Sequence, residues 1–412
     1  MKTISLNSGM TRRPIRIGLN LLYLLPGIVG GTETYASGLL RGLAEVDDQL
    51  EYVVFMNQES ARWPLPEIPV IRRVICPVRA TNRLQRLAFE QTRLPAMARE
   101  HDLDLMHSLG NVSPIFNSCP SVVTIHDINI KGHGRSMPLL KRVILAFLVR
   151  RGAYATRAVI TNSEFSRGEI HRHLGLPLDR IHVVPLASDL RDDILSEQSG
   201  FASDTDTPDQ PGEIDGPYIL AFASQSSHKN IPRLIEAFAR IAPSFPHNLV
   251  LAGHLPRDGA TDAAIARWNM TDRVRITGFL PRANVMRLME KAELFVFPSL
   301  YEGFGLPLLE AQTMGTPVAC AQRGALPEVA GESAVYFDPE QVLDMAATLA
   351  HLLSDEELRT QLVAKGYKNQ QRFSWTAAAR KTLDIYAMAA WRGRNRFVGK
   401  KQSPAHKPVE DE

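Results

Sequence analysis

The stretch RDDILSEQSGFASDTDTPDQPGEIDGPYILAFAS, residues 191–224, divides this 412-residue sequence into two similar halves. Residues 191–217 are rich in Asp, Ser, Gly, Pro and Gln and poor in apolar side chains, a composition typical of an exposed linker. Residues 218–224 form a short, almost continuous apolar run, which predicts a buried strand. Because a chain of this length is too long for one compact core, we place a domain boundary in the linker.

Short β-branched runs alternate with helical stretches on both sides of this linker. Runs of this kind predict a parallel sheet that helices cover on both faces. We therefore expect an α/β protein with two doubly wound, Rossmann-like domains. The expected strands are residues 15–22, 51–56, 103–109, 121–127, 158–163 and 181–187 in the first half, and 218–224, 248–254, 273–279, 293–299 and 316–322 in the second.

The expected organisation has five parts. In open sheets of this class, ligands bind beyond the carboxyl ends of the strands, so the two domains should face each other across a cleft. Functional residues should then follow strands directly. The five expected parts of the chain are an N-terminal domain (1–190), the linker (191–217), a C-terminal domain (218–370), a last helix (371–392) and a polar, basic tail (393–412).

The composition argues against several classes of protein. Apolar residues make up 44% and charged residues 22% of the sequence, as in ordinary globular proteins. The longest apolar runs, such as residues 143–149, fall far short of the roughly 20 residues of a membrane-spanning helix, and we recognise no secretory signal. The three cysteines, Cys76, Cys119 and Cys320, are widely separated. They predict neither a disulfide framework nor a structural zinc site, and they fit a cytoplasmic protein.

The net charge of +3 is unevenly distributed along the chain. Residues 1–190 hold 23 Lys and Arg against 16 Asp and Glu, whereas residues 191–412 hold 24 against 28. Residues 79–100 and 135–157 combine basic and apolar side chains at helical spacing. Such helices can lie on an anionic membrane surface, but ordinary covering helices of a basic domain explain them equally well. We find no nucleic-acid-binding module and expect no nucleic-acid partner.

The stretch LYEGFGLPLLE, residues 300–310, places two glutamates around a glycine-containing bend directly after an expected strand. Glu302 is expected on the loop and Glu310 inside the following helix. Gly303 and Gly305 would let the backbone approach a ligand. Buried glutamates are uncommon unless they are paired, and a carboxylate can accept hydrogen bonds from two neighbouring ribose hydroxyls. This stretch is therefore the main candidate for a binding site.

Three weaker candidates also follow strands. Gly30 and Gly31 precede an expected helix, where a phosphate could bind, although a tight structural turn explains them at least as well. His126 follows an apolar run and could donate to a sugar hydroxyl or an oxyanion, but taken alone a capping histidine is the favoured interpretation. Lys229 lies at a helix start, where a cation is unfavourable unless an anion is held beside it. A lysine that points to solvent is the alternative.

Together these features resemble the retaining GT-B glycosyltransferases of family 4, also called glycosyl transferases group 1. The resemblance covers about residues 15–390, and its E-x7-E element is specific in this local context, whereas the other motifs are individually weak but occur in the right order. It rests on the paired Rossmann-like halves, Gly30 and Gly31, IHD (125–127), TNSEFS (161–166), HKN (228–230) and E-G-F-G-L-P-x-x-E (302–310).

The resemblance implies roles for individual residues. Glu310 matches the glutamate that binds the ribose hydroxyls of a nucleotide-sugar donor, and Glu302 matches the glutamate near the donor sugar. Lys229 matches the basic residue on the donor diphosphate, and His126 a histidine close to the transferred sugar. The last helix would pack back on the first, acceptor-binding domain. Further donor-binding positions are Gly30, Gly31, His228, Phe304, Gly305 and Leu306.

The resemblance also implies a reaction. A hexose, with mannose as a guess, would move from a nucleoside-diphosphate sugar to a glycan or lipid-linked saccharide during synthesis of cell-surface polysaccharide or lipopolysaccharide. The departing diphosphate can take the acceptor proton, so the enzyme mainly positions reactants and stabilises charge. Many members carry an arginine where this sequence has Ala223, and another where it has His228. Stabilisation of the leaving group would then depend more on Lys229, His228 and helix N-termini.

Two pairs of acids match the loose D-x-D pattern that binds a divalent cation in nucleotide-sugar enzymes of another fold. Asp102 and Asp104 open a strand at its amino end, and Asp204 and Asp206 lie in the linker. Both positions are on the wrong side for a cleft. We therefore predict no metal site and no cofactor, with the nucleotide sugar as a substrate.

Two other functions stay open at this point. A nucleotide-sugar 2-epimerase would share the double-Rossmann architecture, although the E-G-F-G-L-P-x-x-E element argues against it. A catalytically silent nucleotide-binding subunit is the other alternative, suggested only by the loss of the family arginine. The expected location is the cytoplasm. Peripheral attachment to the inner face of the cell membrane stays open.

Overall fold

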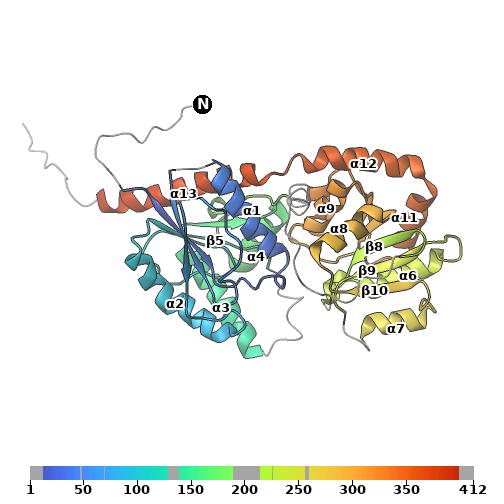
Figure 1. Ribbon diagram of the computed structural model, residues 1–412, viewed down its shortest axis with the longest axis horizontal. Coiled ribbons are helices and arrows are strands. Elements are labelled where there is room, and N and C mark those ends of the chain that lie inside the picture. The colour runs from blue at the N-terminus through green and yellow to red at the C-terminus, as the bar shows by residue number, and fades with distance from the viewer. Residues whose placement is uncertain are drawn as a thin grey trace, which may run out of the picture.

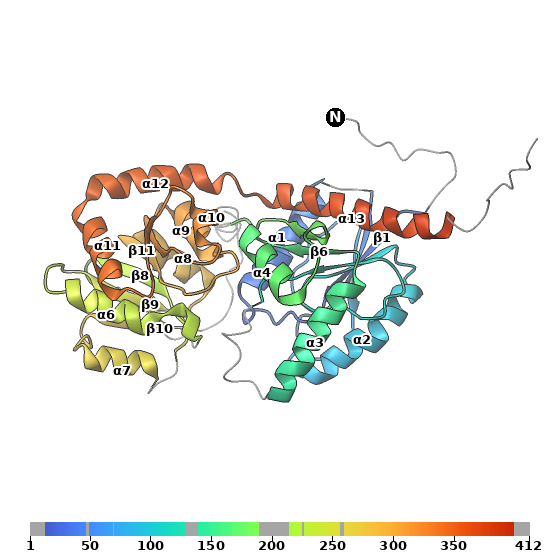
Figure 2. The ribbon, with the colours of Figure 1, turned by 180° about the vertical axis from the view of Figure 1, so that it is seen from behind.

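The computed structural model shows two lobes that lie side by side, each built on one sheet with helices on its faces (Figures 1 and 2). We call the lobe of strands β1–β7 the N-lobe and the lobe of strands β8–β13 the C-lobe. The structure describes residues 139–141 and 391–398 by their backbone alone. The structure describes residues 13–46, 49–68, 70–128, 139–188, 214–224, 226–255 and 259–398.

The N-lobe contains a seven-stranded parallel sheet with the order β3-β2-β1-β4-β5-β6-β7. The order reverses between β1 and β4, so the loops that follow these two strands meet at one edge of the sheet. The elements are β1 (Arg16–Leu21), α1 (Gly31–Val46), β2 (Glu51–Met56), β3 (Ile71–Ile75), α2 (Arg83–Glu100), β4 (Leu105–Ser108), β5 (Ser121–Thr124), α3 (Leu139–Ala155), β6 (Ala158–Thr161), α4 (Glu164–Leu174), the 3₁₀ turn η1 (Leu178–Arg180) and β7 (Ile181–Val183).

The C-lobe contains a six-stranded parallel sheet with the order β10-β9-β8-β11-β12-β13. Here the order reverses between β8 and β11. The elements are β8 (Tyr218–Phe222), the 3₁₀ turn η2 (Ser227–Lys229), α6 (Ile231–Ile241), β9 (Asn248–Ala252), α7 (Ala260–Arg267), β10 (Val274–Gly278), α8 (Arg282–Lys291), β11 (Leu294–Phe297), α9 (Leu306–Met314), β12 (Val318–Ala321), α10 (Leu326–Ala330), β13 (Val335–Phe337), α11 (Val342–Ser354) and α12 (Glu356–Gln370).

The predicted α/β architecture with two Rossmann-like sheets is confirmed, and every expected strand is present inside its predicted range. The central strands are buried on both faces; β11, for example, is fully buried along its length. Two strands were not predicted. Both β3 and β13 lie at the edge of their sheet, where one side of a strand has no neighbour and the apolar run is weaker.

The last helix, α13 (Trp375–Val398), returns from the C-lobe and packs along α1 of the N-lobe (Figure 1). Trp375 is 5% exposed and lies directly against Gly38 of α1, where any Cβ would collide with the indole ring. The helix continues to Val398, beyond residue 392 where we expected it to end. It therefore ties the two lobes together through a buried seam.

Several expected features lie outside the described residues. The linker 191–217 is described only from Ile214, so Asp204 and Asp206 are not placed, and the tail is described only as far as Val398. Within the described ranges, no helix combines the length and the apolar character needed to cross a membrane.

Candidate active site

Lys229 and Glu302 meet where the strand order of the C-lobe reverses. Lys229 ends the turn that follows β8, and Glu302 lies on the loop that follows β11. Lys229 Nζ lies 2.8 Å from Glu302 Oε1 and 5.1 Å from the centroid of the Phe297 ring. The two side chains are 19% and 15% exposed. The anion that we expected beside the lysine is, in this structure, the carboxylate of Glu302.

The turn that carries Lys229 is fixed to the neighbouring strand. Asn230 has φ 58°, a left-handed conformation that asparagine tolerates better than most residues. Its side-chain amide donates to the carbonyls of Pro298 and Pro339 at 3.1 and 2.8 Å. The Leu300 N–H donates to the His228 carbonyl at 2.7 Å. These bonds join the loops after β8 and β11, and sequence reasoning did not assign Asn230 a role.

The glycines of the E-G-F-G loop have structural reasons that differ from the expected one. Gly305 has φ 99° and forms the N-cap of α9, so it needs the left-handed conformation. Gly303 is not left-handed. A Cβ at Gly303 would lie 2.8 Å from the carbonyl oxygen of His126, which belongs to the other lobe. The close approach of the two lobes is therefore sufficient reason for a glycine at position 303.

Glu310 lies on α9, just over one turn after Leu306, which begins the helix. Its side chain is 14% exposed, and its Oε1 lies 3.8 Å from Nη2 of Arg282 on α8. The carboxylate is therefore shielded by the helix but still borders solvent. Phe304 and Leu306 are both buried, and their side chains pack in the core of the C-lobe.

The first glycine-rich loop is held by Glu33 in the first turn of α1. Glu33 Oε2 accepts the Gly27 N–H at 2.8 Å, and Oε1 accepts the Trp63 indole N–H at 2.9 Å. Gly30 has φ 56°, which favours glycine. A Cβ at Gly31, by contrast, would meet no atom within 4 Å, so packing does not require glycine there. The space around Gly31 at the start of α1 is therefore open, and its role in donor binding stays a prediction.

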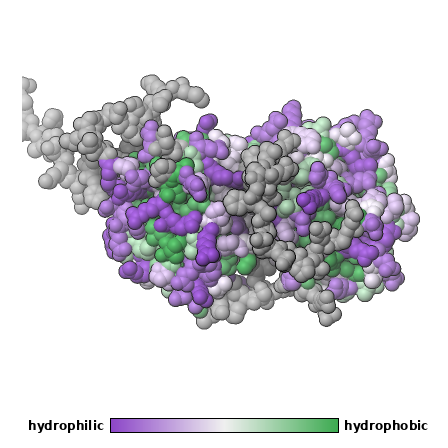
Figure 3. All heavy atoms as spheres, viewed as in Figure 1, coloured by the Kyte–Doolittle hydropathy of each residue, from purple (hydrophilic) through white to green (hydrophobic). Residues whose placement is uncertain are grey.

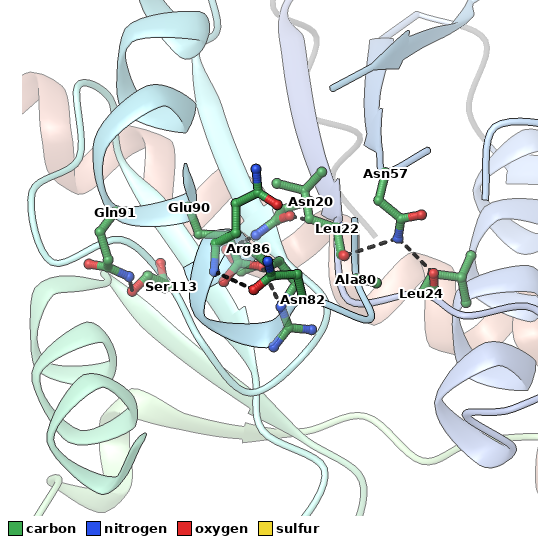
Figure 4. Close-up of polar contacts among 12 residues, drawn as sticks. Asn20, Leu22, Leu24, Asn57, Ala80, Asn82, Arg86, Glu90, Gln91 and Ser113 are labelled. Atoms are coloured by element: carbon green, nitrogen blue, oxygen red, sulfur yellow. Dashed lines mark hydrogen bonds and ion pairs between the residues drawn. The ribbon is translucent and has the colours of Figure 1, made fainter. Parts of the chain in front are cut away.

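A group of amides supports the start of the same loop (Figure 4). Asn20, near the end of β1, accepts the Leu22 N–H at 3.1 Å. Asn57, directly after β2, donates to the carbonyls of Leu22 and Leu24 at 3.0 and 2.7 Å. The loop after β1 is thus anchored from two neighbouring strands. No motif marks these asparagines, so sequence reasoning missed them.

Glu90 of α2 lies next to this group and is 3% exposed (Figure 4). Burial raises the pKa of Glu90 to about 7, against opposing effects from Arg86 and from a side-chain hydrogen bond with Asn20. Arg86 Nε lies 3.9 Å from Glu90 Oε1. The carboxyl therefore changes charge near neutral pH.

His126 lies two residues beyond β5 and is 8% exposed. Its ring Nε2 lies 2.9 Å from the Leu109 carbonyl oxygen, which can only accept, so Nε2 carries the proton. Burial lowers the pKa of His126 to about 4, and the Leu109 bond opposes this only partly. The histidine is therefore neutral at pH 7 with Nδ1 as an acceptor. The expectation that its ring donates to a ligand is wrong for this arrangement, because its one proton is already used.

A buried polar chain beneath His126 links the N-lobe sheet to α13. His107 contacts the Tyr386 hydroxyl through Nδ1 at 2.7 Å and the Thr124 hydroxyl through Nε2 at 2.8 Å. Tyr35 O–H and Thr124 are 2.8 Å apart, and the Tyr35 ring packs edge-on against His126. Burial lowers the pKa of His107 to about 3. The last helix thus contributes to the support of His126.

The acids of the first D-x-D pair are engaged in ion pairs at the amino end of β4. Arg13 Nη1 lies 3.0 Å from Asp104 Oδ2, and Arg16 Nη1 lies 3.8 Å from Asp102 Oδ2. Within the described part of the chain, no group of three His, Cys, Asp or Glu side chains is placed to hold a metal ion. Whether the reaction needs a metal stays a prediction.

Comparison with known proteins gives two family matches. Residues 29–192 match Glycosyltransferase Family 4, and residues 204–369 match Glycosyl transferases group 1. The O-antigen chain mannosyltransferase B of Escherichia coli is 29% identical over 287 residues, which cover 65% of this chain and 70% of that protein. The MMP alpha-(1->4)-mannosyltransferase of Mycolicibacterium hassiacum is 31% identical over 246 residues, 58% of this chain and 56% of that protein. This second match thus spans little more than half of the relative's length.

Solved structures share the fold at low sequence identity. Sucrose-phosphate synthase from Thermosynechococcus elongatus has a TM-score of 0.68 at 19% identity and covers 94% of this chain and 100% of that chain. HepE of Anabaena, solved in complex with UDP and glucose, has a TM-score of 0.66 at 19% identity, with 91% and 100% covered. WaaG, a glycosyltransferase involved in lipopolysaccharide biosynthesis, has a TM-score of 0.63 at 16% identity, with 90% and 99% covered. The two-lobed arrangement is thus that of the GT-B fold.

Proposed function

The chain belongs to the GT-B glycosyltransferases of family 4, and from this premise we propose that it moves a hexose from a nucleoside-diphosphate sugar to a saccharide or lipid-linked saccharide. We propose mannose as the hexose, because two relatives are mannosyltransferases by name. Assembly of cell-surface polysaccharide is the proposed setting, since one of them is named for the O-antigen chain.

The observation that carries the proposal is the pair of Lys229 and Glu302 at the point where the C-lobe strand order reverses. Removing two charges from water largely offsets their mutual attraction, so a mostly buried ion pair of this kind contributes little net stability. A hydrogen bond to a charged phosphate contributes about 1.5–3 kcal/mol. A donor diphosphate can therefore replace Glu302 as the partner of the Lys229 ammonium. The Glu302 carboxylate is then free to accept hydrogen bonds from hydroxyls of the donor sugar. Glu310, further along the same segment, would hold the ribose hydroxyls.

In the proposed retaining reaction, the bond between the anomeric carbon and the β-phosphate oxygen breaks as the acceptor oxygen bonds the same carbon on the same face. The acceptor proton moves to the departing phosphate oxygen. Lys229 and the backbone N–H groups at the start of α1 stabilise the negative charge that develops there. His126, neutral with its proton on Nε2, would accept a hydrogen bond from a sugar hydroxyl through Nδ1. No step requires a metal ion.

We also propose that the N-lobe binds an anionic membrane surface through α3. Val143 and Phe147 of this helix are 56% and 57% exposed. Arg142, Arg150 and Arg151 are exposed on the same helix. Exposed apolar side chains flanked by cations suit a surface of anionic lipids, where a lipid-linked acceptor would be found. On the face of the molecule in Figure 3, apolar residues of the N-lobe gather among hydrophilic ones.

The test is a transfer assay in which GDP-mannose and other nucleotide sugars are offered with saccharide acceptors, and products are identified by mass and by the anomeric configuration in NMR spectra. We expect transfer with retention, unaffected by a metal chelator. We expect Lys229→Ala and Glu302→Gln to lower kcat/KM at least about tenfold, the loss of one charged hydrogen bond. Lys365→Ala, at an exposed position of α12, is the matched control.

Three results would contradict the proposal in different ways. Unchanged turnover in both site variants would remove the assigned residues from the reaction. An epimerised donor without acceptor would favour the nucleotide-sugar epimerase. Nucleotide binding without transfer for every donor and acceptor would favour the silent binding subunit.

A further inference from the structure

The N-terminus of α4 in the N-lobe directly contacts the E-G-F-G loop of the C-lobe, residues 302–305, which we call the donor loop. Ser163 is the N-cap of α4, and its Oγ accepts the Ser166 N–H at 3.0 Å. The same hydroxyl donates to the Gly303 carbonyl at 2.6 Å, and the Ser166 hydroxyl donates to that carbonyl at 3.0 Å. Both serines are fully buried. One carbonyl of the E-G-F-G loop is thus held by two hydroxyls of the opposite lobe.

A carboxylate of the C-lobe caps the same helix. Glu328 of α10 accepts the Glu164 N–H through Oε1 at 2.9 Å and the Phe165 N–H through Oε2 at 3.2 Å. The first N–H groups of a helix have no partner within the helix, and the helix dipole favours an anion there. Next to these bonds, the rings of Phe165 and Tyr301 pack edge to face at 5.4 Å. The lobes therefore meet through a reciprocal set of bonds around one turn of α4.

The loop just before α10, the helix that carries Glu328, holds the other side of the E-G-F-G loop. The Ala325 N–H donates to the Glu302 carbonyl at 3.0 Å, and Gly324 lies so close to the Glu302 backbone that a Cβ would collide with it. Glu302 is therefore fixed from within the C-lobe, whereas the next carbonyl, that of Gly303, is fixed from the N-lobe. The peptide that follows Gly303 is thus held from both lobes.

From this geometry we infer that Ser163, Ser166 and Glu328 are positioning residues that orient the Gly303–Phe304 peptide for the donor sugar when the lobes close. In a trans peptide the C=O and N–H groups point in opposite directions, and the described chain contains no cis peptide. Two hydroxyls that hold the Gly303 carbonyl therefore also set the direction of the Phe304 N–H. The N-lobe controls a donor-sugar contact that it does not itself make.

This inference rests on the proposed function, because it takes the Phe304 backbone as a contact of the donor sugar. It predicts a specific kinetic signature. Lys229 and Glu310, which hold the diphosphate and the ribose, both belong to the C-lobe and do not touch Ser166 or Glu328, so loss of the contact between lobes leaves nucleoside-diphosphate affinity nearly unchanged. The transfer step loses a preorganised hydrogen-bond donor and slows.

The experiment compares Ser166→Ala, Glu328→Gln and Glu328→Ala with the wild type and with Glu332→Gln, an exposed acid of the neighbouring turn that serves as control. We expect kcat to fall about tenfold or more in Ser166→Ala and Glu328→Ala, and less in Glu328→Gln, which keeps an oxygen acceptor. The nucleoside-diphosphate Kd should stay within about threefold. Wild-type kcat in both Ser166→Ala and Glu328→Ala would overturn the inference.

Amide hydrogen exchange over residues 300–306 gives a second measurement that does not depend on activity. We expect faster exchange in this segment for Ser166→Ala and Glu328→Ala, with exchange in the rest of the C-lobe unchanged. Unchanged exchange would overturn the inference, even if the wild type transferred no sugar. Absence of transfer in the wild type with this exchange pattern would count against the proposed function and not against the positioning role.

Discussion

Replacing Gly303 with alanine tests whether the two lobes must meet at the donor loop. The added Cβ would lie 2.8 Å from the His126 carbonyl oxygen, 3.0 Å from Asp127 Cβ and 3.2 Å from Ser166 Oγ, whereas ordinary contact begins at 3.4 Å. The first neighbour is backbone and cannot rotate away. The lobes must therefore separate by about 0.6 Å at this point, and packed interiors do not absorb such a change without cost.

A separation of this size weakens the bonds across the contact. The distance from Ser166 Oγ to the Gly303 carbonyl is 3.0 Å. An increase of about 0.6 Å would take it beyond a useful hydrogen-bond length. The loss of one or two such bonds costs about 1–3 kcal/mol. If that contact is needed in the transition state, kcat/KM falls by a factor of about 5 to 150.

The assay is steady-state transfer from the preferred donor, with Tm measured in parallel. Gly168→Ala is the control. Gly168 lies on α4, the helix that carries Ser166, and a Cβ at this position meets nothing within 4 Å. We expect the control to keep full activity. A Gly303→Ala protein with kcat/KM within twofold of wild type would refute the reasoning.

Three further predictions address the N-lobe. Trp375→Ala removes a buried ring from the seam between α13 and α1, and we expect it to lower the free energy of unfolding by about 3–5 kcal/mol in urea titration; a loss below about 1 kcal/mol would show that α13 is not anchored there. Burial raises the pKa of Glu90 above its ordinary value of 4.5 to about 7, so its stabilising protonated form is present below pH 4.5 and lost as the pH rises through 7. Glu90→Gln stays neutral, and its Tm relative to wild type should rise between pH 5 and pH 8; a constant difference would contradict the burial argument. Phe147→Glu on α3 should weaken sedimentation with vesicles of anionic lipid by about threefold or more, and equal sedimentation would exclude α3 as the membrane contact.

The sequence was sufficient to predict the central strands because these are buried on both faces and read as continuous apolar runs. Of the four strands at the sheet edges, it missed two, β3 and β13. In β3, Arg72 and Arg73 are exposed, which breaks the apolar run that marked the other strands. In β13 only three residues pair, from Val335 to Phe337, too few to stand out from a loop. Both strands depend on a neighbour that the local pattern does not show.

The residues of the candidate site were found from their positions directly after strands, but their relationships were not. Lys229 and Glu302 are 73 residues apart and become partners because β8 and β11 are adjacent in the sheet. The proton position of His126 depends on the carbonyl of Leu109, 17 residues earlier. Such facts follow from strand order and loop shape, which spacing along the chain does not contain.

The same limit explains the different roles of the glycines. Gly303 and Gly305 were expected to make room for a ligand, but the first faces a backbone carbonyl of the other lobe and the second caps α9. Gly31, by contrast, has neither a left-handed conformation nor a crowding neighbour. A glycine's purpose can be assigned only when its surroundings are known.

The central claim is that the C-lobe binds a nucleoside diphosphate between Lys229 and Glu310, and a thermal-shift titration with a panel of nucleoside diphosphates tests it most directly. A ligand at 100 times its Kd should stabilise the folded protein by about 2.7 kcal/mol. We predict that one base raises the Tm selectively, and that Lys229→Ala and Glu310→Gln each reduce this shift while Lys365→Ala does not. If no nucleoside diphosphate changes the Tm, or if both site variants respond like the wild type, the account is contradicted.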